Sequence, residues 1–78
     1  MKVRLYTKEE CGLCEEAEAT LRKLQRKIGF DLELVYIESA PGMYEEYRER
    51  IPVLEVDGEE VAEAPLDEAT VRRAIVGL

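Results

Sequence analysis

The first third of the chain passes from a two-residue hydrophobic period to a helical one. Apolar and polar side chains alternate over residues 2–6, which is typical of a β-strand with one buried face. Residues 7–10 are predicted to form a loop. A helix is predicted from Leu13 to about Ile28, where Gly29 ends it. The apolar residues of this helix recur at helical spacing and are expected to form one buried stripe: Leu13, Ala17, Leu21, Leu24 and Ile28.

Two further elements are predicted in the middle of the chain. Residues 32–37 read as a strand that is apolar on both sides over its centre, as expected for a parallel strand covered on both faces. With the first strand and the helix it makes a right-handed strand–helix–strand unit. Ser39 to Pro41 is typical of a helix start, and a short helix is expected through about Arg48. The inward or interfacial residues of that helix are expected to be Met43, Tyr44 and Tyr47.

The last third is predicted to form a hairpin and a helix. Residues 53–56 are a third strand, Asp57-Gly58 is a strong two-residue turn signal, and residues 60–64 return as an edge strand. Pro65 stops this strand, and Asp67 can cap the last helix. The residues of that helix expected to face the sheet are Val71, Ala74, Ile75 and Leu78. The predicted element order is β-α-β-α-β-β-α.

The chain is strongly acidic. Its 78 residues carry 18 acidic and 11 basic side chains, for a net charge of −7. Contacts to phosphates need clustered lysines and arginines, so this balance argues against nucleic acid and against anionic membrane surfaces as partners. No apolar run approaches the roughly 18–20 residues of a membrane span, and the N-terminus lacks the pattern of a signal peptide. We therefore expect a cytoplasmic protein with a single domain over residues 1–78.

The candidate chemistry lies in two cysteines, Cys11 and Cys14, at the predicted start of the first helix. Cα atoms at i and i+3 on a helical turn are roughly 5–6 Å apart, close to the usual span of a disulfide. Free backbone N–H groups and the positive end of the helix dipole favour an anion such as a thiolate there. Structural disulfides are rare in the cytosol, so the pair is interpreted as redox-active. With no histidine and two cysteines, one chain cannot supply four metal ligands, so no metal site is predicted.

These motifs carry a family resemblance. The chain resembles the glutaredoxins and the minimal thioredoxin fold, and most of all the short glutaredoxin-like proteins. The resemblance rests on the run Lys8-Glu9-Glu10-Cys11-Gly12-Leu13-Cys14, on Ile51-Pro52-Val53-Leu54 and on Asp57-Gly58. It implies an α/β, thioredoxin-like fold whose four-stranded mixed sheet has the strand order 2-1-3-4 and is flanked by three helices.

The resemblance also implies roles for individual residues. Cys11 is expected to be the nucleophile, and Cys14 the thiol that resolves the mixed disulfide. Pro52 is expected to follow a cis peptide bond and to lie against the disulfide, while Ile51 before it offers its backbone to an extended substrate. Lys8 is expected to help bind the carboxylate of glutathione.

Two departures from the family pattern concern substrate binding. Glutaredoxins typically carry Pro-Tyr between the cysteines, whereas this chain carries Gly12 and Leu13, which we expect in the substrate-binding surface. Glutaredoxins also hold glutathione with a Gly-Gly turn and an Asp; here the glycine pair is absent and Asp67 is the one candidate substitute. No resident cofactor is expected, and glutathione is expected to be a poor partner. The carboxylates that flank the cysteines should also repel it: Glu9, Glu10, Glu15 and Glu16.

The predicted function is thiol–disulfide oxidoreductase, with Cys11 and Cys14 reducing or exchanging disulfides. The expected partners are a disulfide-containing protein or a small-molecule disulfide, together with a dithiol reductant or a reductase. The protein is expected to be a monomer. Two alternatives stay open: an iron–sulfur or metal carrier in which two chains share their cysteines, and a non-catalytic interaction domain on a thioredoxin scaffold.

Overall fold

The computed structural model describes residues 1–77 and shows one four-stranded sheet with three α-helices. Its elements are β1 (Lys2–Thr7), α1 (Gly12–Ile28), β2 (Asp31–Tyr36), the 3₁₀ helix η1 (Ile37–Ser39), α2 (Met43–Tyr47), β3 (Val53–Val56), β4 (Glu59–Glu63) and α3 (Glu68–Val76). The predicted element order is therefore confirmed, and η1 is the addition to it. Among the described residues, no helix combines the length and the apolar character that crossing a bilayer requires.

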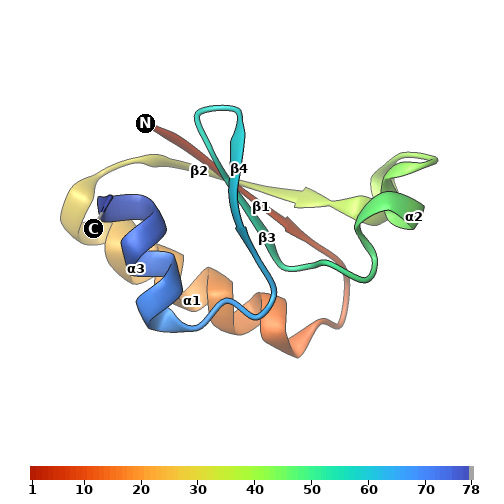
Figure 1. The fold of residues 1–78 in the computed structure, drawn as a ribbon, viewed down its shortest axis with the longest axis horizontal. Coiled ribbons are helices and arrows are strands. Elements are labelled where there is room, and N and C mark those ends of the chain that lie inside the picture. The colour runs from red at the N-terminus through yellow and green to blue at the C-terminus, as the bar shows by residue number, and fades with distance from the viewer. Residues whose placement is uncertain (78) are drawn as a thin grey trace.

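The sheet has the order β2-β1-β3-β4, as the resemblance implied (Figure 1). β1 and β2 are parallel, whereas β3 is antiparallel to both β1 and β4. The crossover through α1 makes the first pair parallel, and the turn at Asp57 and Gly58 makes the last pair antiparallel. A register irregularity in the β3–β4 pair falls between Leu54 and Glu55.

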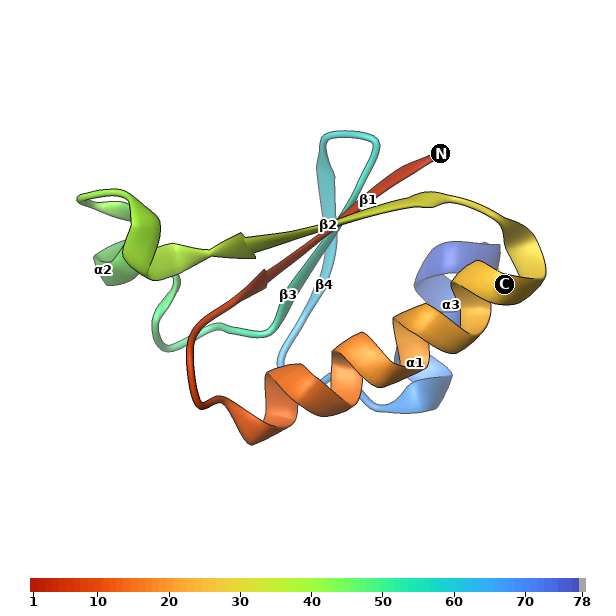
Figure 2. The same cartoon turned by 180° about the vertical axis from the view of Figure 1, so that it is seen from behind.

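The main core lies between one face of the sheet and the two longer helices, α1 and α3 (Figure 2). β1 and β3 contribute Val3, Leu5 and Leu54 to this core. The other members come from the helices and the segments beside them: Ala17, Leu21, Leu24, Phe30, Leu66, Val71 and Ile75. α3 is held at its start by Asp67, whose side chain accepts a 2.8 Å hydrogen bond from the backbone N–H of Thr70, so the predicted cap is confirmed. Leu78, which was expected to face the sheet, lies outside the described residues.

The buried stripe of α1 differs from the predicted one at both ends. Leu13 is 61% exposed and Ile28 is 46% exposed, while Cys14 is buried together with Ala17, Leu21 and Leu24. The helix begins one residue earlier than predicted, and its inward line starts at Cys14, about 100° around the axis from Leu13. At the other end of the helix, Phe30 is buried in the core, a role that the prediction gave to Ile28.

The opposite face of the sheet is open and polar. The prediction that β2 is covered on both faces is wrong, because α2 has only five residues and lies beyond the end of the strands (Figures 1 and 2). β2 is an edge strand, and no residue along it is fully buried. Its apolar residues Leu32 and Leu34 pack against the main core from one side only.

The segment between β2 and α2 also departs from the prediction. Ser39 does not cap a helix; its hydroxyl donates a 2.7 Å hydrogen bond to the carbonyl of Tyr36 and closes the turn of η1. α2 starts only after Gly42, whose φ of 85° lies in the left-handed region. Ile37, predicted as the last strand residue, is fully buried in η1. The inward residues of α2 were predicted correctly: Met43, Tyr44 and Tyr47.

Candidate dithiol site

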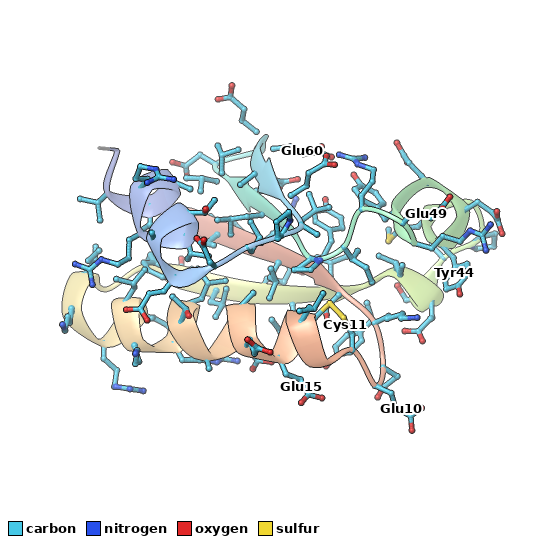
Figure 3. The ribbon with its side chains drawn as sticks, turned by 60° about the horizontal axis from the view of Figure 1, so that its bottom comes forward. Glu10, Cys11, Glu15, Tyr44, Glu49 and Glu60 are labelled. Carbon is cyan, nitrogen blue, oxygen red and sulfur yellow. A yellow bond between two sulfur atoms is a disulfide. The ribbon has the colours of Figure 1, made fainter. Side chains whose placement is uncertain are left out.

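The two cysteines form a disulfide at the start of α1 (Figure 3). Their Cα atoms are 5.2 Å apart, within the range that the helical spacing predicted. Cys11 is the N-cap residue of the helix, with extended backbone angles, and its carbonyl accepts a 3.0 Å hydrogen bond from the N–H of Glu15. Cys14 lies in the first turn. The disulfide therefore joins the cap of the helix to its first turn.

The two sulfur atoms have different surroundings. Cys14 is 1% exposed, whereas Cys11 is partly exposed. The backbone N–H of Cys14 points at the sulfur of Cys11, at 3.2 Å, and donates a hydrogen bond to it. In the reduced protein that sulfur is the thiol or thiolate of Cys11, and a donated N–H stabilises the charged form. This geometry favours Cys11 as the sulfur that is both accessible and activated.

A small hydrophobic cluster, separate from the main core, surrounds the disulfide. Its buried members are Cys14, Ile37, Ile51 and Val53. Partly buried residues from β1 and α2 pack against it: Tyr6, Met43, Tyr44 and Tyr47, together with Cys11. The structure thus brings Ile51, which precedes β3, to the cysteines that precede and begin α1. The adjoining Pro52 is less than 2% exposed, and the Ile51–Pro52 peptide bond is cis.

The backbone of Ile51 is already partly engaged. Its N–H donates a 3.1 Å hydrogen bond to the carbonyl of Tyr47, the last residue of α2. The resemblance implied that Ile51 offers its backbone to a substrate strand. In this conformation the N–H is committed to α2, so the carbonyl is the group left for that role.

The remaining predicted site residues have different environments. Lys8 is half-buried in the loop that follows β1, and Gly12 and Leu13 are exposed at the first positions of α1. Asp67 is the cap of α3, and the N–H of Thr70 that it accepts lowers the pKa of its carboxyl. The carboxylate of Asp67 therefore already has a structural role, and a bound glutathione would have to compete with the Thr70 N–H for it.

Several carboxylates lie at the end of the molecule that carries the partly exposed Cys11. Figure 3 shows Glu10 and Glu15 at the same end of the molecule as Cys11. The structure adds Glu38 from η1, whose carboxylate accepts a 3.2 Å hydrogen bond from the backbone N–H of Glu9. No group of three or more acidic, cysteine or histidine side chains within residues 1–77 has the arrangement of a metal site.

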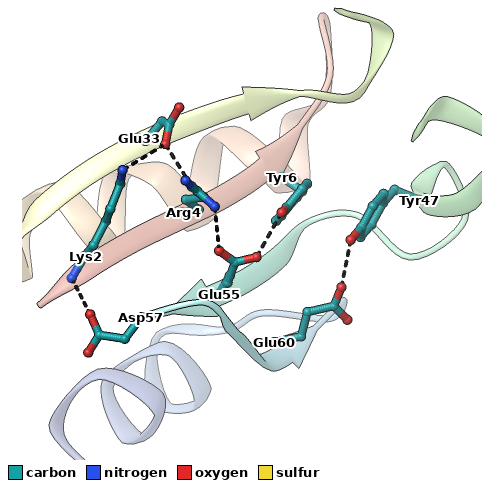
Figure 4. Close-up of polar contacts among 8 residues, drawn as sticks. All are labelled: Lys2, Arg4, Tyr6, Glu33, Tyr47, Glu55, Asp57 and Glu60. Atoms are coloured by element: carbon teal, nitrogen blue, oxygen red, sulfur yellow. Dashed lines mark hydrogen bonds and ion pairs between the residues drawn. The ribbon is translucent and has the colours of Figure 1, made fainter. Parts of the chain in front are cut away.

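A polar network that the sequence did not predict lies on the open face of the sheet (Figure 4). Glu55 on β3 is only 8% exposed and accepts hydrogen bonds from Arg4 at 3.1 Å and Tyr6 at 2.9 Å. Arg4 also pairs with Glu33 of β2 at 2.9 Å. Burial, and then the bond to Glu55, raise the pKa of Tyr6. The signal in the sequence was a lone glutamate in an apolar strand opposite an arginine in the first strand.

The network continues toward the disulfide through Tyr47. Its ring stacks on that of Tyr6, with 4.5 Å between centroids, and its hydroxyl donates a 2.8 Å hydrogen bond to Glu60. That bond is the main reason why the pKa of Tyr47 is raised, and the same bond, with Arg50, lowers the pKa of Glu60. Arg50 lies over the Tyr47 ring at 5.1 Å and binds the carboxylates of Glu60 and Glu63. These contacts tie α2, and with it the disulfide cluster, to β4.

Comparison with known proteins gives a consistent result. The family model of the glutaredoxin-like domain (DUF836) matches residues 2–76. Among curated proteins, the chain is 30% identical over 79 positions to the uncharacterized protein Rv0508 of Mycobacterium tuberculosis, covering 95% of this chain and 81% of that protein. Two solved structures share the fold. The protein XcR50 of X. campestris has a TM-score of 0.76 and 27% identity over 97% of both chains. Ne2328 of Nitrosomonas europaea has a TM-score of 0.73 and 36% identity over 90% of this chain and 85% of that one.

Proposed function

The chain belongs to the glutaredoxin-like (DUF836) family, and from that premise we propose that it is a thiol–disulfide oxidoreductase working through Cys11 and Cys14. One observation carries the proposal. The partly exposed sulfur of Cys11 accepts an N–H at the start of a helix, and a buried partner thiol lies one turn away. A thiol-redox role fits this arrangement because the attacking group in exchange is a thiolate with access to a substrate.

The proposed reaction has two exchange steps. The thiolate of Cys11 attacks one sulfur of a substrate disulfide, forms a mixed disulfide and releases the other substrate sulfur as a thiolate. Cys14 then loses its proton and attacks Cys11, which releases the second substrate thiolate and leaves the Cys11–Cys14 disulfide. Because Cys14 is held one turn away, its effective concentration is high and the second step is fast. An external dithiol or reductase supplies the two electrons that return the protein to the reduced state.

We propose that a substrate chain lies beside Ile51 and pairs with its carbonyl. The N–H of Ile51 is bound to the carbonyl of Tyr47, so only the carbonyl of Ile51 pairs with the substrate. This pairing is weaker than a full strand-to-strand contact. The exposed side chain of Leu13 offers apolar contact area next to Cys11. All of these groups belong to one chain, so the proposed chemistry needs no second copy.

The substrate class follows from charge. The carboxylates around Cys11 repel an anionic disulfide and favour a neutral or cationic one. Glutathione is an anion, and Asp67, the one candidate substitute for its usual anchor, is already used as a helix cap. We therefore propose a protein disulfide with a neutral or basic surface as the substrate, and a protein dithiol as the electron donor.

A turnover assay on hydroxyethyl disulfide tests the proposal. The protein is supplied with electrons either from glutathione and its reductase or from thioredoxin and its reductase. The wild type should turn over faster with the thioredoxin system, and Cys11→Ser should abolish turnover with both. If the wild type never exceeds Cys11→Ser with either electron source, the proposed activity is wrong.

A further inference from the structure

The two longer helices, α1 and α3, lie on the same side of the sheet (Figures 1 and 2). A second candidate site lies between them. A pocket of about 270 Å³ opens between the C-terminal half of α1 and α3. Four of the 11 basic residues of the chain line it: Lys23, Arg26, Lys27 and Arg72. Leu24, which is 5% exposed, is the apolar side chain among its described lining residues. This concentration of positive charge stands out on a chain whose net charge is −7.

Helix stability alone does not explain these cations. Basic residues in the last turn of a helix complement its dipole, which accounts for Arg26 and Lys27. Lys23 precedes that turn, and its spacing of three and four residues from the other two sets like charges side by side, which destabilises a helix. Arg72 comes from α3, on the far side of the pocket.

The acidic side chains in the pocket do not balance this charge. Of the described residues that line it, Glu68 is the one with a carboxylate, and this group is shared between Lys23 at 3.7 Å and Arg72 at 4.0 Å. Within residues 1–77, neither Arg26 nor Lys27 takes part in an ion pair. Among the residues that the structure describes, the pocket therefore keeps a net positive charge.

We infer that this pocket binds a small anion that carries at least two negative charges, with a phosphoryl group as the preferred charged part. Two arginines from different helices can each present a planar fork to phosphate oxygens, and the lysines add mobile point charges. The volume of about 270 Å³ lies near the lower limit of typical ligand pockets, which fits a small phosphorylated molecule. The site is distinct from the dithiol, because Lys23 and Lys27 lie roughly 18–24 Å along the helix axis from Cys11.

The test uses the full chain in its oxidised form, so that thiol chemistry plays no part. Inorganic pyrophosphate is titrated at constant ionic strength while backbone amide shifts are recorded by NMR, with acetate as the monovalent comparison. Shifts centred on residues 20–27 and 68–72 are expected with pyrophosphate and not with acetate. Equal shifts with the two anions, or pyrophosphate shifts centred elsewhere, would overturn the inference.

A matched pair of variants separates the pocket from overall charge. Arg26→Gln with Arg72→Gln removes two arginines that line the pocket, one from each helix. Arg22→Gln with Arg73→Gln removes two exposed arginines from the same helices outside it. The first pair should weaken pyrophosphate binding at least about tenfold, because charge-assisted hydrogen bonds are lost, and the second less than about twofold. Equal weakening in both pairs would show general attraction and no site.

Discussion

Neutralising Glu10 and Glu15 should relieve the discrimination of the protein against oxidised glutathione. Both carboxylates lie at the same end of the molecule as Cys11, and Glu15 is one helical turn beyond it (Figure 3). Oxidised glutathione is a dianion at neutral pH, so each carboxylate repels it as it approaches. A neutral disulfide does not experience this repulsion. The second-order rate constant for oxidised glutathione, divided by that for a neutral disulfide, therefore isolates the electrostatic contribution.

The size of the effect follows from distance and screening. At about 10 Å in water, one carboxylate slows a dianion about threefold at ~10 mM ionic strength and about 1.5-fold at ~150 mM. The double variant Glu10→Gln with Glu15→Gln should therefore raise the ratio about eightfold at the lower ionic strength and about twofold at the higher. Removing these charges also favours the thiolate of Cys11, but this change affects both substrates and cancels in the ratio.

The assay is stopped-flow oxidation of the reduced protein by oxidised glutathione or by hydroxyethyl disulfide, at both ionic strengths. Asp31→Asn with Glu59→Gln is the matched control, because both residues are exposed and lie at the opposite end of the sheet strands. At ~150 mM that control should leave the ratio within about 1.5-fold of wild type, since both charges lie beyond the screening length of ~8 Å. At ~10 mM the screening length is ~30 Å and the control should raise the ratio about twofold, well short of the roughly eightfold rise expected for the double variant near Cys11. The reasoning fails if wild-type protein reacts with oxidised glutathione faster at low ionic strength than at high. Attraction would then govern the encounter, and Lys8 would be restored as a glutathione-binding residue.

Three further predictions concern the dithiol, the polar face and the cap of α3. Cys14→Ser should accumulate a mixed disulfide on Cys11, seen by mass spectrometry; faster alkylation of Cys14 than of Cys11 in reduced wild type would reverse the assignment. Tyr6→Phe keeps the ring but removes its bond to the buried Glu55, so the free energy of unfolding should fall by about 1–2 kcal/mol in urea titration; an unchanged midpoint would mean the bond is not formed in solution. The lowered pKa of Asp67 gives stability that is present above the ordinary aspartate pKa and lost as pH falls through the lowered native value. The melting temperature of wild type should therefore fall relative to that of Asp67→Asn as pH drops from 7 to about 2, so that the advantage of wild type at pH 7 is lost; parallel curves would contradict this.

Local signals in the sequence predicted most of the fold. The alternation in β1, the helical period of α1 and the Asp57-Gly58 turn each depend on residues close in the chain. The cysteine spacing predicted the 5.2 Å separation for the same reason, because one helical turn fixes it. The cap at Asp67 was equally local. The placing of β3 beside β1 needed the family resemblance, since nothing local specifies that pair.

Most of what the sequence did not predict depends on contacts between elements, whereas the turn that Ser39 closes at η1 is a local error. The apolar run of β2 predicted cover on both faces, but the cover depends on where α2 packs, and α2 lies at the end of the sheet. The bond from Arg4 to Glu55 joins residues 51 positions apart, so the lone glutamate of β3 can be paired with that arginine only when the two strands are known to be neighbours. The hydrogen bond from the Ile51 N–H to the Tyr47 carbonyl could likewise not be predicted, because it depends on the conformation of the turn between α2 and β3.

The presence of two separate hydrophobic clusters has a consequence for how this protein can change over evolutionary time or in the laboratory. On β3 the adjacent residues Val53 and Leu54 belong to different clusters, so this one strand contributes side chains to both. Side chains around the disulfide, such as Met43 and Tyr44, can be exchanged without repacking the residues that hold α1 and α3 on the sheet. The side chains that surround the disulfide and those that hold the two longer helices on the sheet are thus different sets of residues. A library confined to two partly buried members of the small cluster, Met43 and Tyr44, would vary the surroundings of the disulfide while leaving the buried side chains of both clusters in place.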